Sequence, residues 1–340
     1  MSTPKPTIAE VAVLARVSAP TVSKVINGRA DVAAETRARV EDAIDQLGYQ
    51  RRRQGPPAPG TGLVDLVFHR IGSPWAGEII GGVESAAAEA RVSVILTELG
   101  GAHRPPASWV ETTLARPPLG ILLVASHLTP SQREQIAHRS IPVVVIDTDG
   151  ESPEDVAAVG SDNWGGGLLA TRHLIGLGHT RIAAIGGPAT MLSSRARLDG
   201  FRSAHAEAGI AVDPHLVMEG DFYVGAGYRA ARELFAMPPG GRPTAVFAGS
   251  DMQALGVLRA AHECGLVVPR DVSVVGYDDL TLCEWSAPSL TSVDQKLATQ
   301  GAVATRLVLD LAEGRRPALD RVNLTAELVV RESTAPPPAP

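Results

Sequence analysis

Carboxylates, a serine and a tryptophan follow apolar runs of this chain at the points where buried strands would end. The residues in these positions are Ser73, Trp75, Asp147, Asp251 and Asp278. In open α/β sheets, ligands bind beyond the carboxyl ends of the strands, so side chains at such ends converge on one cleft. The spacing therefore predicts a ligand-binding cleft assembled from several separate segments.

The residue types in this predicted cleft suit a ligand that is rich in hydroxyl groups. Trp75 offers a flat apolar face that matches the C–H face of a sugar ring. Arg197 and Asp278 can form charge-assisted hydrogen bonds to hydroxyl groups. The structural alternatives, a core tryptophan and an ordinary salt bridge, are weaker because the residues recur at strand ends. Two other tryptophans, which suit a cleft, a core or a dimer contact equally well, are Trp164 and Trp285.

A second group of small, hydroxyl and basic residues lies near the N-terminus, on one face of a short predicted helix. The apolar residues of the stretch APTVSKVI fix the other face of that helix as buried. The outward face then carries Ala19, Thr21, Ser23 and Lys24. Small and hydroxyl side chains let a helix enter the major groove of DNA, Lys24 can donate to guanine, and Thr21 and Asn27 can bind phosphates. This surface favours a DNA-reading role over a helical bundle without one.

Capping signals place three short helices in residues 7–48. Thr7 is positioned to cap the first helix, and Ser18 to cap the second, which has Pro20 in its first turn. A third helix is predicted from about residue 35 to residue 47. Two short helices joined by a tight turn, with a third behind them, indicate a helix-turn-helix module.

The charge of the chain is unevenly distributed. Residues 1–54 hold nine Arg or Lys and six Asp or Glu, a net +3, and because the whole chain carries −6, the other 286 residues carry −9. A basic head on an acidic body indicates a polyanion partner for the head alone. Charge by itself fits a solvated mixed surface equally well.

The length and composition limit the class of protein. A chain of 340 residues suits a small module followed by a two-lobed one. Its two cysteines, Cys264 and Cys283, form no CxxC pair, so neither a disulfide framework nor a metal site is expected. Residues 1–20 contain no uninterrupted apolar segment, and no later run reaches membrane-spanning length. We expect a cytoplasmic protein with no membrane contact, metal or cofactor.

The head is followed by a linker and then by a body of alternating helical and apolar segments. Residues 50–62 (QRRRQGPPAPGTG) contain three prolines and three glycines and are a linker. The body then alternates helical stretches with continuous apolar runs, which indicate strands buried on both faces and hence parallel sheets covered by helices. These runs are too many for one compact sheet, so two doubly wound lobes are expected. The runs are residues 63–68, 92–97, 119–124, 141–146, 181–185, 244–248 and 272–276.

The motifs of the head and body together resemble those of the LacI/GalR (lactose-repressor) family of transcriptional regulators. The head is similar to the family headpiece over TIAEVAVLARVSAPTVSKVING and VAAETRARVEDAIDQLGY. The body resumes the resemblance at DNWGGGLLATRHLIGLGHTRIAAIGGP, RARLDGFRSAHAEAGI, VFAGSDMQALGVLRAA, VSVVGYDD and ELVVREST. The order and spacing of these segments make the resemblance specific over nearly the whole chain.

The resemblance implies an all-α helix-turn-helix headpiece on a two-lobed, periplasmic-binding-protein-like α/β domain with doubly wound parallel sheets. It also implies an allosteric homodimer that binds double-stranded operator DNA and a small effector, most readily a mono- or oligosaccharide of xylose type. The expected units are a headpiece (1–48), a linker (49–62), a body (63–333) and a disordered tail (334–340). Within the body, lobe 1 is expected at 63–161 and 291–322, and lobe 2 at 162–290 and 323–333.

The resemblance also implies which residues make contacts. The implied effector contacts are Ser73, Trp75, Asp147, Asp162, Arg197, Phe222, Asp251, Asp278 and Gln295. The implied DNA contacts are Thr7, Ser18, Ala19, Pro20, Thr21, Ser23, Lys24, Asn27, Arg51, Arg52 and Arg53. Lys24 stands where the family usually has Arg, and a lysine is a point donor without the bidentate fork, so weaker base discrimination is expected.

Two residues, the linker and the C-terminal segment depart from the family pattern. Ser250 replaces the usual Asn before Asp251, and Ala76 replaces a second aromatic residue after Trp75, which predicts room for a larger ligand. The linker lacks the leucines that relatives insert into the minor groove, and its prolines block a hinge helix. What remains is the Arg51-Arg52-Arg53 cluster, which suits phosphates or a narrow minor groove. The C-terminal RESTAPPPAP has no leucine heptad, so a dimer is expected and not a tetramer.

Two other classes of protein compete with a regulator. An enzyme would need catalytic motifs, but the Gly165-Gly166-Gly167 run is followed by no Lys-Ser/Thr and no GxSxG elbow is present. Strand-end carboxylates could form an acid/base pair, although a sugar-binding cleft uses the same residues. A solute-binding transport protein shares the body fold but lacks the N-terminal module. The sequence therefore favours a repressor without enzymatic activity.

Overall fold

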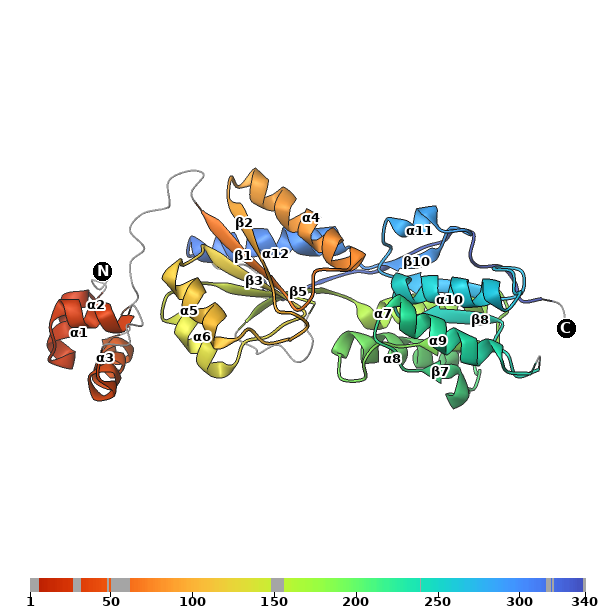
Figure 1. Cartoon of the computed structure of the whole chain (residues 1–340), viewed down its shortest axis with the longest axis horizontal. Helices are drawn as coiled ribbons and strands as arrows, with labels where there is room; N and C mark the ends of the chain where they lie inside the picture. Colours follow the sequence, from red (N-terminus) through yellow and green to blue (C-terminus); the bar gives the residue numbers. More distant parts are fainter. Residues whose placement is uncertain are drawn as a thin grey trace.

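The structure is a computed structural model that describes residues 6–26, 32–47, 49, 62–147, 156–238, 240–315, 319 and 321–338. Along the chain it contains a three-helix headpiece followed by two α/β lobes (Figure 1). The expected all-α module and two-lobed α/β body are therefore both present.

The headpiece consists of α1 (Ile8–Ala15), α2 (Ala19–Ile26) and α3 (Ala34–Leu47). Thr7 caps α1 reciprocally with Glu10: the Thr7 N–H donates to Glu10 Oε2 at 2.6 Å, and the Glu10 N–H donates to Thr7 Oγ1 at 3.4 Å. The Thr21 N–H donates to Ser18 Oγ at 3.3 Å at the start of α2. Both predicted caps are confirmed. Completely buried valines from the three helices, Val11, Val22 and Val40, form the shared core.

Lobe 1 contains a parallel sheet in the order β11-β5-β4-β3-β1-β2 among the described strands. The strands are β1 (Leu63–Phe68), β2 (Ser93–Glu98), β3 (Gly120–Val124), β4 (Val143–Ile146), β5 (Ala157–Ser161) and β11 (Arg321–Leu324). The helices are α4 (Pro74–Glu89), α5 (Ala107–Ala115), α6 (Pro130–Ala137) and α12 (Leu297–Ala312).

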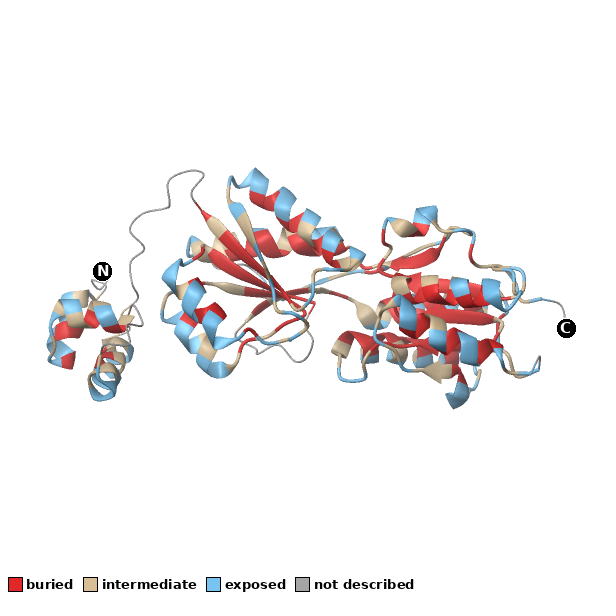
Figure 2. Ribbon diagram, viewed as in Figure 1, coloured by how far each residue is buried: buried red, intermediate tan, exposed pale blue. Residues whose placement is uncertain are grey.

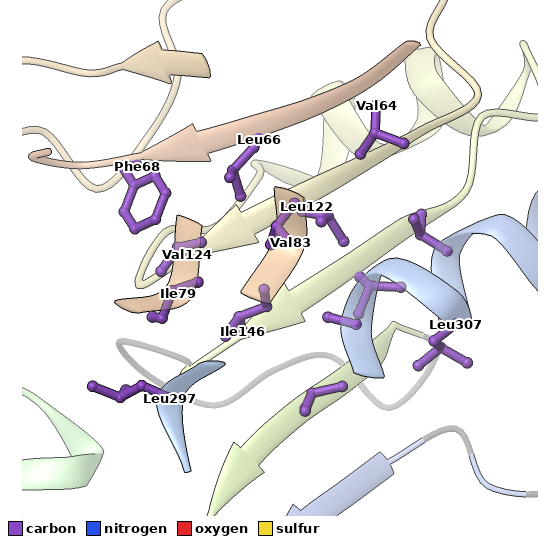
Figure 3. Packing of buried hydrophobic residues seen from close by; sticks show 14 of the residues in the cluster. Val64, Leu66, Phe68, Ile79, Val83, Leu122, Val124, Ile146, Leu297 and Leu307 are labelled. Carbon is purple, nitrogen blue, oxygen red and sulfur yellow. The ribbon is translucent and has the colours of Figure 1, made fainter. Parts of the chain in front are cut away.

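Two cores cover the two faces of this sheet. On one face, Leu66 and Phe68 of β1 pack with Ile79 of α4 and Leu307 of α12 (Figure 3). On the other face, side chains of β1 and β3 pack against α5 and α6. Burial on both faces explains why the central strands read as continuous apolar runs.

Lobe 2 contains a second sheet in the order β12-β10-β9-β8-β6-β7, in which the pairing of β12 with β10 is antiparallel. The strands are β6 (Ile182–Ile185), β7 (Val217–Met218), β8 (Ala245–Ala248), β9 (Ser273–Tyr277), β10 (Thr291–Asp294) and β12 (Glu327–Val329). The helices are α7 (Asn163–Gly176), α8 (Leu192–Glu207), α9 (Val224–Phe235), α10 (Asp251–Glu263) and the single turn α11 (Leu282–Trp285), with a short 3₁₀ turn η1 (Pro214–Leu216). In both lobes the buried strands lie beneath helices whose outer faces are exposed (Figure 2).

The described chain passes between the two sheets three times, and two of these crossings differ from expectation. Because β10 pairs with β9 and β12, the second crossing lies after Asp294 and not near residue 290. Because β11 pairs with β5, the third crossing lies after Leu324 and not after residue 322. These two strands are short and partly polar, so no apolar run marked them.

The C-terminal segment also differs from the disordered tail that composition predicted. A His173 ring nitrogen lies 2.9 Å from the Thr334 hydroxyl, and a His179 ring nitrogen lies 2.9 Å from the Ala335 carbonyl oxygen. Residues 334 and 335 are therefore part of lobe 2, because polar groups of the lobe bind their side chain and backbone.

Three pairs of helices approach each other closely through reciprocal glycines. In α4 and α12, a Cβ on Gly82 would lie 1.9 Å from the Ala298 carbonyl oxygen, and a Cβ on Gly301 would lie 2.4 Å from the Ile79 carbonyl oxygen. Only glycine permits such backbone proximity. The equivalent pairs are Gly167 with Gly200 in α7 and α8, and Gly227 with Gly256 in α9 and α10.

Candidate functional site

A cavity of about 270 Å³ lies between the two lobes, beyond the carboxyl ends of strands from both sheets. This is the location that strand-end chemistry predicts for a ligand. Lobe 1 and lobe 2 both contribute to its walls, so a bound ligand would contact the two together. The predicted residues that line it are Ser73, Trp75, Asp147, Arg197, Phe222 and Asp278.

Arg197 of α8 is held rigidly at the base of the cavity. Its side chain is only 5% exposed, its Nε donates to Asn163 Oδ1 at 2.8 Å, and its Nη1 donates to the Gly249 carbonyl at 2.6 Å. The guanidinium carbon lies 3.7 Å from the centroid of the Tyr277 ring. Hydrogen bonds and a cation–π contact thus fix the guanidinium before any ligand arrives.

Asp278, which directly follows β9, is the buried carboxylate that faces this arginine. Its Oδ1 lies 3.7 Å from Arg197 Nη1 and accepts a hydrogen bond from Gln295 Nε2. Burial raises the pKa of Asp278 well above its ordinary value, and the charge of Arg197 opposes that rise. A largely desolvated pair of this kind gains from a ligand that brings further hydrogen bonds.

Several of the cavity residues have an unusual backbone conformation. The φ angles of Asp147, Phe222 and Asp278 are 46°, 67° and 113°. Residues other than glycine rarely adopt a positive φ angle. Backbone strain of this kind concentrates at binding sites. The backbone here therefore aims side chains into the cleft where the strands end.

Aromatic and apolar surfaces complete the walls. The Trp75 ring meets the Phe68 ring edge-on at a centroid distance of 6.3 Å, and Phe222 lies against Gly187, where a Cβ would come within 2.1 Å of its ring. The hydroxyl of Ser250 donates to the Phe222 carbonyl at 2.8 Å. The serine found in place of the usual asparagine therefore both lines the cavity and fixes the Phe222 backbone.

Three of the implied effector contacts lie outside this cavity. Asp251 is completely buried, and its oxygens accept hydrogen bonds from Ser292 Oγ and the Leu280 N–H. Gln295 is also completely buried. Its Nε2 donates to Asp278, and its Oε1 accepts from Ser161 Oγ at 3.0 Å. Asp162 caps α7 by accepting from the Gly165 N–H at 2.8 Å and lines a neighbouring cavity. In this structure Asp251 and Gln295 therefore support the cavity walls, and their direct contact with an effector stays a prediction.

One further expectation about the cavity is wrong. Ala76 is completely buried in the core between α4 and the sheet, so its small size does not enlarge the cavity. Of the two adjacent residues Trp75 and Ala76, only Trp75 lines the cavity.

Several cavity residues were not expected. His69 and His103 stack with ring centroids 4.7 Å apart, and Tyr223 lies beneath the Arg70 guanidinium at 5.7 Å from its ring centroid. His69 and Arg70 directly follow β1, so the strand-end signal that selected Ser73 could have found them. His103 and Tyr223 lie on loops that no apolar run or helix signal could place. Met191 and Asp221 also line the cavity from loops of lobe 2.

The burial of α2 determines where the residues predicted to contact DNA lie on the headpiece. Val22 and Val25 point into the core, and Lys24 is exposed. Ser18 and Thr21 form a hydroxyl pair with their oxygens 2.8 Å apart, on the same outer side. Thr7 and Pro20 are exposed, and Ala19 and Ser23 are half-buried. The predicted contacts Asn27, Arg51, Arg52 and Arg53 lie outside the described residues.

No group of three or more His, Cys, Asp or Glu side chains in the described part of the chain could hold a metal ion. Within the same residues, no helix combines the length and the apolar character that a membrane span requires.

Two family models match the chain. Residues 7–52 match the model for "Bacterial regulatory proteins, lacI family", and residues 171–334 match the model for "Periplasmic binding protein-like domain". The first match covers the headpiece, and the second covers lobe 2 from within α7 onward, together with α12 and β11 of lobe 1.

Individual relatives match over nearly the whole length. The transcriptional regulator CelR of Thermobifida fusca is 36% identical, over 97% of this chain and 98% of its own. The ribose operon repressor of Escherichia coli (strain K12) is 34% identical, over 96% of this chain and 99% of its own.

Solved structures share the fold. A CelR–cellobiose complex superposes with a TM-score of 0.71 at 36% identity and covers 96% of this chain and 99% of its own. The lac repressor dimer bound to operator and the anti-inducer ONPF superposes with a TM-score of 0.68 at 27% identity and covers 98% of this chain and all of its own.

Proposed function

The chain belongs to the LacI family of bacterial regulatory proteins, and from that membership we propose that it represses carbohydrate-utilisation genes under the control of a saccharide. The headpiece binds operator DNA through α2, and the saccharide binds in the cavity between the lobes. The protein acts in the cytoplasm as a homodimer, since a twofold dimer matches a near-palindromic operator.

One observation carries the saccharide assignment. The cavity combines the faces of Trp75 and Phe222 with the buried pair of Arg197, from α8, and Asp278, which directly follows β9. Flat aromatic faces suit the C–H faces of a sugar ring, and fixed charged groups suit its hydroxyls. The relatives support the same class of ligand, since one is a ribose operon repressor and another was solved with cellobiose.

Control of DNA binding follows from where the ligand sits. A ligand shifts a conformational equilibrium only by its differential affinity for the two states. Lobe 1 contributes Trp75 and Asp147 to the cavity, and lobe 2 contributes Arg197 and Asp278. Because the ligand contacts both lobes, its binding energy depends on their relative position, which also sets the spacing of two headpieces in a dimer.

The test is a mobility-shift assay on DNA upstream of the gene, with and without a panel of saccharides. We expect a specific complex with the wild-type protein whose stability changes with at least one saccharide. Asp278→Ala should form the same complex and lose the response, because the cavity and the headpiece are separate units. An exposed carboxylate on α8 supplies the matched control, and Asp199→Ala should behave as wild type.

Calorimetry on the same variants separates the possible outcomes. Unchanged saccharide affinity in Asp278→Ala would refute the assignment of the cavity. Turnover of glycosides by the wild-type protein would instead favour an enzyme.

A further inference from the structure

A second cavity, of about 400 Å³, adjoins the first beside the crossing from β5 to α7. Lobe 1 lines it with the ends of β5 and β11, and lobe 2 lines it with the first turns of α7 and α8. Asp147 and Ser193 line both cavities. The two spaces therefore adjoin each other at these two residues.

Trp164 gives the second cavity its distinctive surface. This residue is the second of α7, lines the cavity and keeps 45% of its surface exposed. An indole so placed offers a flat apolar face beside polar groups. The polar residues Asp162, Asn163 and Asn323 line the same space. The second cavity thus repeats the chemistry of the first, an aromatic face among groups that bind hydroxyls.

The polar groups of the two cavities form one connected set. Arg197, which lines the first cavity, donates from Nε to Oδ1 of Asn163, which lines the second, at 2.8 Å. Asn163 also donates from Nδ2 to the Ser161 carbonyl at 3.2 Å. A ligand that spans both cavities would meet side chains already oriented by each other.

The volumes of the two cavities also favour a ligand that occupies both. Pockets for small-molecule ligands usually enclose about 300–1,000 Å³. The first cavity, at about 270 Å³, lies just below that range and suits a single sugar ring. The two cavities together fall well within the range.

From these observations we propose that the second cavity is a saccharide subsite in which Trp164 stacks on a second sugar ring, so that the effector is at least a disaccharide. This inference rests on the proposed function, because it assumes that a saccharide binds in the first cavity.

The experiment is calorimetry on the full chain with matched series of sugars: glucose, cellobiose and cellotriose, then xylose, xylobiose and xylotriose, with ribose as a further monosaccharide. Wild-type protein should bind one disaccharide at least roughly tenfold more tightly than its monosaccharide, which corresponds to about 1.4 kcal/mol. Trp164→Ala should remove that advantage and leave the affinity for the monosaccharide unchanged. Trp164→Phe, which keeps an aromatic face, should retain part of it.

The unchanged affinity for the monosaccharide also shows that the variant is folded. Leu169→Ala is the control on the same helix, because Leu169 is 36% exposed and lines neither cavity. It should behave as wild type toward every sugar.

The remaining outcomes separate the two proposals. Equal affinity for a monosaccharide and its oligomers, or a disaccharide preference that survives in Trp164→Ala, overturns the subsite and leaves the saccharide regulator intact. If the wild-type protein binds no sugar of either series and no ribose, the saccharide assignment itself is overturned, and the subsite with it.

Discussion

At the scale of single residues, the base of the cavity is a set of buried polar groups that support one another. Gln295 donates to Asp278, Asp278 faces Arg197, and Arg197 donates to Asn163. Buried groups of this kind are costly when they lose a partner. The arrangement therefore fixes the geometry of the guanidinium and carboxylate, and a ligand needs to organise little on arrival.

Base reading by α2 gives a prediction for Lys24, which is exposed on the outer side of the helix. Lys24→Ala should weaken binding to the operator by about 1–3 kcal/mol, because one donor to a base edge is removed, and should relax preference at one base step. Fluorescence anisotropy on operator and random duplexes at one salt concentration measures both effects. An equal loss of affinity on the two duplexes would show that Lys24 contacts only phosphate.

Asp251 gives a prediction about pH. Its burial raises the pKa to about 7, against the hydrogen bonds from Ser292 and Leu280. The folded state then holds the proton more tightly than the unfolded state, so this contribution to stability is present at low pH and is lost as the pH rises from about 4 toward 7. Asp251→Asn carries no charge and can still accept from the Leu280 N–H through its amide oxygen and donate from its NH2 group to the Ser292 hydroxyl. Its stability relative to wild type should therefore rise over that window, by up to about 4 kcal/mol.

Denaturant unfolding of both proteins between pH 4 and pH 8 measures this difference. The exposed Asp199→Asn serves as the control and should track wild type at every pH. A wild-type-to-variant difference that does not change with pH would mean that Asp251 is ionised throughout.

The sequence predicted some residues of the cavity and missed others for a physical reason. Ser73, Trp75, Asp147 and Asp278 follow strands, and a strand end fixes where the next residues lie. His103 and Tyr223 lie on loops whose paths depend on tertiary packing, so no local pattern could assign them. Asp251 also follows a strand, but that position alone did not indicate that its buried carboxylate accepts a hydrogen bond from Ser292.

At the scale of elements, helix packing depends on glycines that let backbones touch. The pair Gly81 and Gly82 on α4 offers a test, because a Cβ on Gly82 would lie 1.9 Å from the Ala298 carbonyl, whereas a Cβ on Gly81 meets nothing within 4 Å. Gly82→Ala should lower the free energy of unfolding by about 1–3 kcal/mol or more, since the backbone of α12 must move. Gly81→Ala should raise it by up to about 1 kcal/mol, because alanine favours the helix.

Thermal and denaturant unfolding compare these two neighbours directly. Equal effects of the two substitutions would show that α12 shifts away from α4 at little cost.

Strands were predictable in proportion to the apolar character of their sequences and not to their burial, since the largely exposed β2 gave an apolar run and the buried β10 did not. All seven apolar runs overlap strands, with end points that differ by at most two residues. The short strands β10 (TSVD) and β11 (RVNL) carry polar residues and gave no such run, and their pairing partners are distant in sequence. Missing them displaced the expected crossings between lobes.

At the scale of the whole molecule, the headpiece and body are joined by a linker whose arginines are expected to meet DNA. Arg51, Arg52 and Arg53 lie outside the described residues, so this prediction rests on the sequence. Changing all three to Gln should reduce the log–log salt slope of operator binding by about two to three, at about 0.9 for each phosphate that is no longer neutralised. Binding isotherms at several salt concentrations give the slope.

The matched control neutralises three exposed arginines of lobe 2, Arg202, Arg259 and Arg270. This variant should keep the wild-type slope. An unchanged slope in the linker variant would mean that its arginines remain hydrated in the complex.

The late strands β11 and β12 have a consequence for how the protein is made. Lobe 1 receives its edge strand β11 from residues 321–324, and lobe 2 receives β12 from residues 327–329. The headpiece has a core of its own within the first 50 residues. During synthesis the DNA-reading module can therefore fold early, whereas neither sensing lobe has its full sheet until nearly the whole chain has left the ribosome. A nascent or truncated chain would thus contain a folded headpiece and two lobes with incomplete sheets. Premature termination near the C-terminus would therefore abolish the response to the effector and leave the headpiece folded.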